Sequence, residues 1–557
     1  MSTQQLLQQA QSALDQTQGI LNQSLTWLKE QCISNDRVSA SKLDEHQLVS
    51  YDLAWSSAEV TGARFALDYA KTVREQDKTG KDILLEEQMT LLFVAESVQN
   101  IKARLGFRLN NFGLTSESIN ALNSEEIQSF CTQQMDAKNL TDLGKKILEL
   151  KGRSGIYLLE EQAQMMQEEF RKFANDTVMP LAEEVHRKDL LIPDEILGPL
   201  TELGCFGISI PERYGGIQSD DHEDNMGMIV VTEELSRGSL GASGSLITRP
   251  EILARALLSG GTEEQRTEWL PKLAMADPLC AVAVTEPDAG SDVAAMKLKA
   301  TKTDGGWLLN GVKSWCTFGA KAGVMLVLAR TNPDMSAGHR GLSLFLAEKE
   351  SFDGHDFEYT QPEGGTMSGR AIATIGYRGM HSYEVFYDNY FVPDKNLIGG
   401  PEGEGKGFYF TMAGFSGGRI QTAARAIGLM QAAFERAVSY SEERAVFGKP
   451  IGQYQLTLVK LARMATLLTV SRQFTYAVGR LMDGGKGQME ASMVKFFTCK
   501  SAEWLTREAQ QIHGGMGYAE ETAVSRYFVD ARVLSIFEGA EEILALKVIL
   551  PALVQNK

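Results

Sequence analysis

Long hydrophobic runs are absent from this chain of 557 residues. No uninterrupted apolar segment approaches the roughly 20 residues that cross a bilayer, so the sequence predicts no membrane partner. The first basic residue is Lys29, and we therefore expect neither a secretory signal nor an Arg-rich transit peptide at the N-terminus. These absences favour a cytoplasmic protein.

Basic residues are in deficit as well. The 55 Lys and Arg residues stand against 72 Asp and Glu residues, which gives a net charge of −17 at pH 7. A surface this acidic repels phosphate backbones, so we expect no nucleic-acid partner. The six cysteines are scattered, without a CxxC pair or an adjacent histidine. They are interpreted as reduced structural thiols, and no metal site is expected.

Glycine and proline are scarce over residues 1–150, where apolar residues recur at helical spacing, as in "LAWSSAEVTGARFALDYA". Residues 151–279 show helical spacing too. From 280 to 396 the pattern changes to short β-branched and aromatic runs punctuated by Gly, Asp and Asn, which is typical of an antiparallel barrel or sandwich. Helical spacing returns over 397–557. The chain is therefore predicted to be α+β, in the order helices, helices, sheet, helices.

A weak internal repeat links the two ends of the chain. The segment from Leu53 aligns with "LARMATLLTVSRQFTYAV" from Leu461, and farther on Phe93 falls opposite Phe497. Two amphipathic helices of similar length also match by chance. We nevertheless interpret residues 1–150 as a degenerate copy of the C-terminal helices.

The stretch "AVTEPDAGSDVAAMKLKATKTDGGWLLNGVKSWCTFGAKAG" contains hydroxyl side chains at two predicted strand ends. Thr285 ends one strand, and Thr317 ends the next beside Trp315. Hydroxyls and backbone amides next to an indole can form a slot for a planar, polar ring. An ordinary hairpin with turn residues would give a similar pattern.

This stretch resembles the flavin-binding signature of the acyl-CoA dehydrogenase family. The segments "IPERYGG", "RAVFGKPIGQYQ", "QIHGGMGY" and "FEG" agree with the family in the same order, over about residues 160 to 557. The resemblance implies a helical N-terminal domain, a middle β-barrel or sandwich and a C-terminal four-helix bundle, with residues 1–150 as an extra helical domain. It also implies bound FAD, an acyl-CoA thioester substrate and electron-transfer flavoprotein as the acceptor.

The family's binding residues carry over position by position. Those that would contact the isoalloxazine are Thr285, Trp315 and Thr317. Ser291 and Arg419 would lie along the CoA thioester, with Ser291 also near the cofactor. The residues that would reach the FAD of a neighbouring subunit are Arg444, Phe447, Gln511, Gly514 and Gly515. Arginine contacts phosphate in bidentate fashion, and glycine admits close backbone approach.

The segment "SIFEGAEEI" would supply the catalytic base. In the family, the glutamate of "YEG" or "FEG" removes the α-proton of the acyl-CoA, and here it is Glu538, with Gly539 leaving room for the thioester. Some relatives place the base directly before the position of Arg419, but that residue is Gly418 here. Glu541 and Glu542 are expected on a solvated turn. A Thr and a Gln that often help to bind FAD after the base are replaced by Ala540 and Glu542.

Within the family, the N-terminal extension and "GTMSGRAIATIGYRGMHSYE" resemble the branch that oxidises methylsuccinyl-CoA to mesaconyl-CoA. Its substrate has a distal carboxylate, for which Arg249 is the first candidate partner and His381, with Arg378, the second. A dehydrogenase or O2-using oxidase of another branched acyl-CoA, and a non-catalytic DNA-binding flavoprotein, are the alternatives.

Relatives form tetramers through their C-terminal helices. A copy of those helices at 1–150 predicts a homodimer instead.

Overall fold

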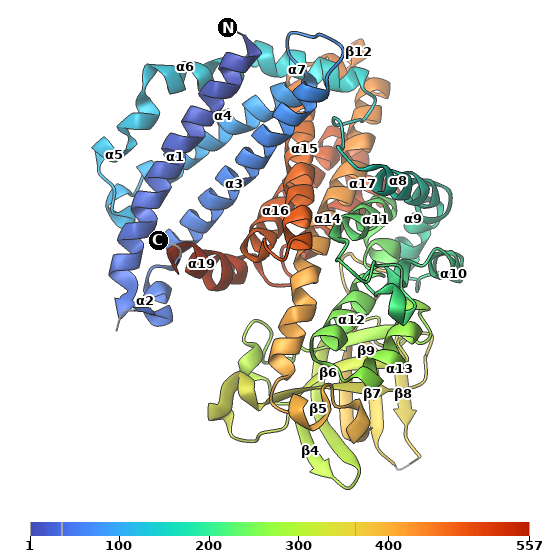
Figure 1. The fold of residues 1–557 in the computed structure, drawn as a ribbon. Coiled ribbons are helices and arrows are strands. Elements are labelled where there is room, and N and C mark those ends of the chain that lie inside the picture. Colours follow the sequence, from blue (N-terminus) through green and yellow to red (C-terminus); the bar gives the residue numbers. More distant parts are fainter. Residues whose placement is uncertain (1, 35–36, 363, 556–557) are drawn as a thin grey trace. The chain divides into compact units, whose positions relative to one another are not determined.

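The computed structural model describes residues 2–34, 37–362 and 364–555 (Figure 1). The chain divides into two compact units, and its two ends belong to the same one. Unit 1 holds residues 1–164 and 422–557, whereas unit 2 holds residues 165–421. Among the residues described, no helix has both the length and the hydrophobicity that a bilayer crossing demands. All six cysteines are free and buried, as expected for structural thiols.

Unit 1 is built from helices. They are α1 (Thr3–Cys32), α2 (Ala40–Glu45), α3 (Gln47–Gln76), α4 (Leu85–Gly106), α5 (Ser116–Asn120), α6 (Glu125–Gln134), α7 (Ala137–Glu149), the second part of α14 (Gly407–Glu443), α15 (Gln455–Asp483), α16 (Gln488–Ile512), α17 (Ala523–Leu534), α18 (Glu541–Ile543) and α19 (Leu550–Gln555). Short two-stranded ribbons join α1 to α2 and α14 to α15.

Helix α1 shows why the first segment is helical. Ser2 and Gln5 form a capping box at its start, which satisfies backbone N–H groups that have no partner within the helix. Leucines at positions 7, 14, 21 and 28 are buried at a spacing of seven residues. This stripe lies on one face of the helix and packs against α3 and α4, which run alongside it in Figure 1.

The predicted repeat corresponds to two similar helix pairs. Helices α3 and α4 are followed by a 3₁₀ turn at Leu109–Phe112, and α15 and α16 by one at Gly514–Tyr518. The two pairs pack against each other within unit 1. Phe93 of α4 contacts its repeat partner, Phe497 of α16, edge to face with ring centroids 5.6 Å apart. Contact between equivalent residues is what a pseudo-twofold axis would produce, and the origin of the two pairs by duplication stays a prediction.

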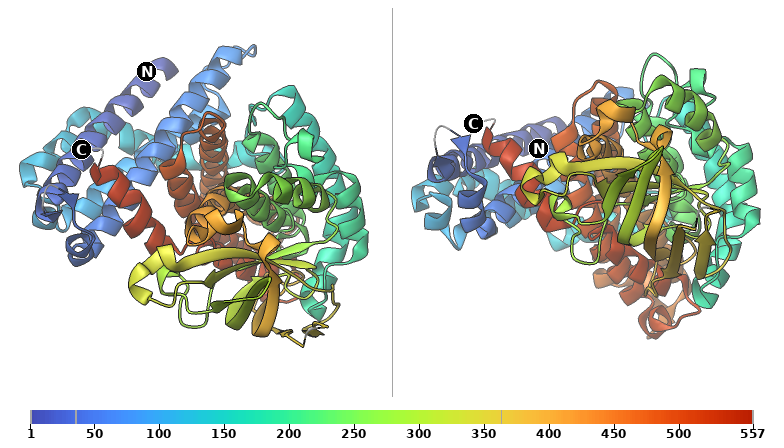
Figure 2. Two further views of the ribbon diagram at one scale, coloured as in Figure 1. Left: turned by 60° about the horizontal axis from the view of Figure 1, so that its bottom comes forward. Right: turned by 90° about the horizontal axis from the view of Figure 1, so that it is seen from below.

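Unit 2 combines helices with one curled sheet (Figure 2). The helices are α8 (Glu161–Phe173), α9 (Met179–Lys188), α10 (Asp194–Glu202), α11 (Asn225–Gly238), α12 (Thr248–Gly260) and α13 (Glu263–Ala274), followed after the sheet by the first part of α14. The strands are β3 (Cys280–Ala283), β4 (Lys299–Thr303), β5 (Gly306–Thr317), β6 (Val324–Arg330), β7 (Leu342–Glu348), β8 (Asp356–Thr360), β9 (Thr366–Ala371) and β10 (Ser382–Pro393). Their order is β3-β6-β4-β5-β10-β9-β8, and β7 also pairs with β6.

Most neighbouring strands are antiparallel, as the sequence pattern predicted, but β6 pairs in parallel with β3 and β4. The chain reaches β6 from β3 only after completing the β4–β5 hairpin. That long connection allows β6 to return in the same direction as β3, whereas a tight turn would force an antiparallel pair. Every residue of β6 is buried, because other elements cover both faces of this central strand.

Candidate active site

Glu538 lies in unit 1, in the turn between α17 and α18. Its backbone φ of 55° is in the left-handed region, which is uncommon for a residue with a side chain. The side-chain Oε2 atom is buried and has no hydrogen-bond partner. The backbone N–H of Glu538 donates to no backbone carbonyl of the described residues. The turn therefore presents an unpaired carboxylate oxygen and an unpaired backbone donor.

Two buried cations hold this turn in place. Lys495 of α16 is fully buried and donates from Nζ to the Gly539 carbonyl at 2.6 Å. Burial lowers the pKa of Lys495, while nearby acidic groups including Glu538 oppose that shift. The Arg425 guanidinium of α14 stacks over the Phe537 ring, 4.6 Å from its centroid. The residues on both sides of Glu538 are thus fixed by helices from elsewhere in unit 1.

Glu541 is not on a solvated turn, contrary to the sequence-based expectation. Its Oε1 accepts a hydrogen bond from the Tyr51 hydroxyl at 3.2 Å and lies 3.3 Å from Lys500 Nζ. Tyr51 belongs to α3, and the Lys500 ammonium lies over its ring and that of Trp55. The N-terminal helices therefore contact the segment that follows Glu538. Glu542 is exposed, as expected.

In unit 2, the flavin-signature residues meet at the ends of two neighbouring segments. The Ser314 N–H donates to the Thr285 carbonyl at 2.8 Å, which brings Thr285 beside the end of β5. Thr317 is buried, and its hydroxyl lies 3.0 Å from that of Ser382. Trp315 has a φ of 60°, and 55% of its surface is exposed. An exposed indole beside two threonines is compatible with the slot for a planar ring that the sequence suggested, and the binding of a ring there stays a prediction.

A buried ion pair shapes this slot. Glu286 accepts hydrogen bonds from the N–H groups of Lys297 and Leu298 and lies 2.9 Å from Lys313 Nζ. Lys313 also donates to the Val284 carbonyl at 2.8 Å. These contacts attach the "TEPDAGSD" turn to β4 and β5, so Glu286 and Lys313 position Thr285. Ser291, at the other end of the turn, is exposed.

The residues predicted to reach a neighbouring subunit's FAD lie at one end of unit 1. Phe447 and Gly448 form the two-residue turn between β11 (Ala445–Val446) and β12 (Lys449–Pro450), with φ of 48° and 83°. Positive φ at both positions is the pattern of a type I′ turn. Phe447 is 97% exposed. A bulky, strained and fully exposed aromatic residue is characteristic of a binding position. Arg444 beside it is exposed as well.

Gly514 and Gly515 belong to the same end. His513 stacks on Tyr440 of α14, with ring centroids 4.2 Å apart, and so joins the end of α16 to the helix that leads to Arg444. Burial lowers the pKa of His513, which fits a structural role. A Cβ added at Gly514 or Gly515 would meet no atom within 4 Å. Their backbone thus faces open space, and Gln511 nearby is exposed.

Apart from Gly539, which lies beside Glu538 in unit 1, the substrate-side candidates are in unit 2. Arg249 is the second residue of α12, only 7% exposed, and its Nη1 atom is buried without a hydrogen-bond partner. Arg419 lies on the first part of α14 and is partly buried, next to the buried Gly418. His381 is buried before β10, with Nε2 3.1 Å from Asp189 Oδ1. Arg378 donates to the His186 and Thr374 carbonyls, which indicates a structural role.

Family models match three consecutive parts of the chain. The acyl-CoA dehydrogenase N-terminal domain matches residues 160–277, the middle domain residues 281–390 and the C-terminal domain residues 405–551. The chain belongs to the acyl-CoA dehydrogenase family. This confirms the family, the fold and the flavin-dependent oxidoreductase class that the motifs implied.

Comparison with individual relatives supports the same family assignment. The (2S)-methylsuccinyl-CoA dehydrogenase of Cereibacter sphaeroides is 37% identical over 97% of both chains. Butyryl-CoA dehydrogenase of Megasphaera elsdenii has a structure with a TM-score of 0.65 and 32% identity, covering 72% of this chain and all of that one. A glutaryl-CoA dehydrogenase of Mycobacterium smegmatis, in complex with FADH2, has a TM-score of 0.63 and 26% identity, covering 71% of this chain and 95% of that one.

Members of this family are FAD-dependent, and the residues of this acyl-CoA dehydrogenase fit the cofactor. The Trp315 slot suits a planar ring, and the open backbone at Gly514 and Gly515 suits the approach of a phosphate. Sequence reasoning missed the groups that hold these parts in position, namely Glu286, Lys313, Arg425 and Lys495. The signal that could have revealed them is a charged residue within an otherwise apolar strand or helix face, since such residues are rarely buried unless paired.

Proposed function

We propose that this acyl-CoA dehydrogenase oxidises (2S)-methylsuccinyl-CoA to mesaconyl-CoA, a step of the ethylmalonyl-CoA pathway. The observation that carries the proposal is the extent of the likeness to the Cereibacter sphaeroides enzyme. It covers 97% of both chains and therefore includes the N-terminal helices. The family models begin only at residue 160 and leave that region out. The shared extension sets this pair apart from the three-domain family pattern.

In the proposed reaction Glu538 accepts the α-proton of the thioester. Its unpaired Oε2 atom is free to do so, and the anchors at Phe537 and Gly539 restrict its movement. The Glu538 N–H is a candidate donor to the thioester carbonyl, where such a contact is typically worth about 2.7–4 kcal/mol in the transition state. FAD, when bound, would supply the acceptor for the β-hydrogen, which leaves as a hydride. The product is the trans-2-enoyl-CoA.

We assign the distal carboxylate of the substrate to Arg249. A buried hydrogen-bond donor without a partner lowers the stability of the folded protein by about 1–3 kcal/mol, and by more when the group is charged. A substrate carboxylate would remove that cost at Nη1, and a bidentate contact would also fix the methyl branch and hence the stereochemistry. His381 is the weaker candidate, because its Nε2 already faces the carboxylate of Asp189.

The test compares a dicarboxylic and an uncharged substrate in Arg249→Lys and Arg249→Met. We expect kcat/KM for methylsuccinyl-CoA to fall at least about 10²-fold in Arg249→Met, as for the loss of a charge-assisted pair of about 3 kcal/mol. Turnover of 2-methylbutyryl-CoA should fall little. Equal losses on both substrates would show a structural role for Arg249. Higher activity of the unmodified enzyme on the uncharged substrate would reject methylsuccinyl-CoA.

The electron acceptor is proposed by family analogy to be electron-transfer flavoprotein, and the compartment to be the cytoplasm. Oxygen consumption compared with dye reduction during turnover decides between a dehydrogenase and an oxidase. Rapid dye reduction with negligible oxygen uptake supports the proposal, whereas stoichiometric oxygen uptake would identify an oxidase.

A further inference from the structure

Three side chains of metal-ligating type meet in unit 2. Asp189 caps the C-terminal end of α9, His355 precedes β8 and His381 precedes β10. One ligand atom from each lies within 4.8 Å of the other two. The three positions are far apart in the sequence and follow no metal-binding spacing. For this reason no motif in the sequence indicates a metal site here.

The hydrogen bonds of His381 are incomplete for a neutral ring. Nδ1 lies 3.1 Å from the Gly379 carbonyl oxygen, and Nε2 lies 3.1 Å from Asp189 Oδ1. Both partners are acceptors, whereas a neutral imidazole has one proton. With that proton on Nδ1, the Nε2 lone pair points at a carboxylate, and a cation between the two removes the repulsion. A carbonyl on the opposite ring nitrogen is also the usual outer partner of a metal-bound histidine.

His355 adds a third donor atom on the solvent side. Its ring centroid lies 4.4 Å from that of His381, and the residue is exposed. A ring protonated on both nitrogens would satisfy the Gly379 carbonyl and Asp189 as an ordinary ion pair, but it would give His355 no role in the cluster. Asp189 and His381 also have positive φ, 53° and 39°. Two non-glycine residues in this region, facing each other, indicate that the fold holds both in fixed positions.

We propose that Asp189, His355 and His381 bind one divalent ion of the Zn²⁺ class. Two imidazole nitrogens and one carboxylate oxygen suit Zn²⁺ at about 2.0–2.2 Å, with a water molecule in the fourth position. Ligand atoms of such a tetrahedron lie roughly 3.4 Å apart, so a spacing of up to 4.8 Å closes by rotation of the exposed His355 ring. Arg378 Nε lies 3.5 Å from Asp189 Oδ1 and moderates the affinity by competing for that carboxylate.

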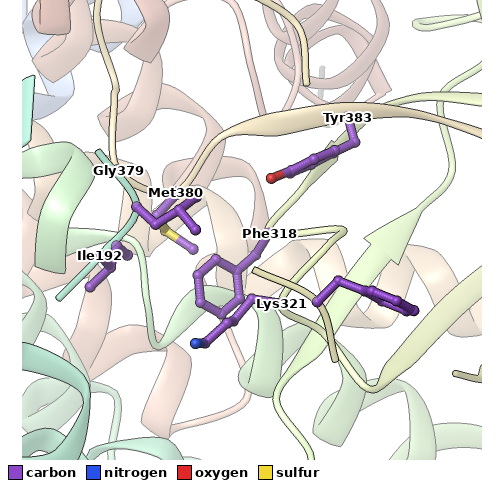
Figure 3. A pocket seen from close by; sticks show the side chains of 8 residues that line it. Ile192, Phe318, Lys321, Gly379, Met380 and Tyr383 are labelled. Carbon is purple, nitrogen blue, oxygen red and sulfur yellow. The ribbon is translucent and has the colours of Figure 1, made fainter. Parts of the chain in front are cut away.

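The bound ion would connect the helical and sheet parts of unit 2, because α9 supplies one ligand and the starts of β8 and β10 the others. It would also stabilise the wall of a small pocket (Figure 3). That pocket is lined by Leu191, Ile192, Phe318, Lys321, Phe352, Gly379, Met380 and Tyr383. Four of these residues lie within two positions of Asp189 or His381. We therefore assign the ion a structural role in this unit.

The experiment uses the untagged, FAD-loaded full chain after treatment with EDTA. Calorimetric titration with Zn²⁺ should show one site per chain. Titration with Co²⁺ should give the visible absorption of a tetrahedral site, at wavelengths beyond the oxidised flavin bands. Zn²⁺ should also raise the unfolding temperature, since an ion that binds only the folded state stabilises it.

The variants are His355→Asn and Asp189→Asn, because asparagine tolerates the left-handed backbone at position 189. Each should weaken Zn²⁺ binding at least about tenfold and abolish the Co²⁺ absorption. His222→Asn is the matched control: it removes an exposed histidine of unit 2 outside the cluster and should bind as the unmodified chain does. The proposal is overturned if the unmodified chain takes up no stoichiometric Zn²⁺ at micromolar concentration. It is also overturned if His355→Asn binds Zn²⁺ as tightly as the unmodified chain.

Discussion

At the scale of single residues, Glu538 combines a left-handed backbone with a buried, unpaired carboxylate oxygen. Neither feature helps the chain to fold. A positive φ costs about 1–3 kcal/mol at a residue other than glycine, and such strain persists only when the surroundings impose it. The fixed Phe537 and Gly539 impose it here. In the proposed reaction, the stability given up at this turn serves to present the carboxylate to the substrate.

Glu538→Gln tests that role. Glutamine is nearly isosteric but accepts no proton, so we expect FAD and acyl-CoA binding to persist while turnover falls at least about 10²–10⁴-fold. Anaerobic bleaching of the flavin by substrate measures the step directly. Glu117→Gln, an exposed acid of unit 1 outside this turn, is the control and should bleach at the unmodified rate. Near-normal bleaching in Glu538→Gln would falsify the assignment.

Short motifs are the basis on which the ligand-contacting residues are proposed, because the chemistry would restrict each of those positions. They did not predict the partners of Glu541. Tyr51 and Lys500 reach it from α3 and α16, and nothing in "SIFEGAEEI" encodes a contact with a helix almost 500 residues away. The Asp189–His355–His381 cluster escaped for the same reason. Such residues become recognisable only when the fold brings distant segments together.

At the scale of elements, α7 and α15 approach closely at a glycine. A Cβ at Gly144 would lie 2.3 Å from the Leu458 carbonyl oxygen, which is backbone and cannot move aside. Gly144→Ala should therefore destabilise unit 1 by about 1–3 kcal/mol, despite the better helix propensity of alanine. A lower midpoint of thermal unfolding, followed by circular dichroism of the full chain, would show this effect.

Gly19→Ala in α1 is the matched control. A Cβ there meets no atom within 4 Å, so the substitution should stabilise the chain by about 0.4–1 kcal/mol through helix propensity alone. A neutral or stabilising Gly144→Ala would contradict the close α7–α15 contact.

Helical periodicity predicted that α7 and α15 are helices, and strand patterning predicted the sheet. Neither pattern encodes which helices touch, or that β6 has parallel neighbours, since periodicity describes one segment at a time.

At the scale of the whole molecule, the N-terminal helices α3 and α4 pack on α15 and α16 within unit 1. The family resemblance implies that relatives assemble dimers into tetramers through their C-terminal helices. Because the chain covers these helices with its own N-terminal pair, we predict that assembly stops at the homodimer. Light scattering at micromolar concentration should give the mass of two chains, about 122 kDa from the 61.2 kDa of one.

A tetramer would contradict this prediction. A chain beginning at Tyr157 is the complementary test, since removal of the N-terminal helices uncovers apolar faces of α15 and α16. We expect it to aggregate or to form tetramers. A well-behaved dimer of the shortened chain would show that the cover is not what limits assembly.

The division of unit 1 between the two ends of the chain also determines when it can fold during synthesis. Helices α1, α3 and α4 leave the ribosome first, but α15 and α16 emerge only after all of unit 2 has been made. At about 5–20 residues per second, that interval is on the order of tens of seconds. Unit 2 is contiguous and can fold in the meantime. The apolar faces of the first helices must be shielded until then, so the nascent chain should depend on chaperones more strongly than relatives without the extension.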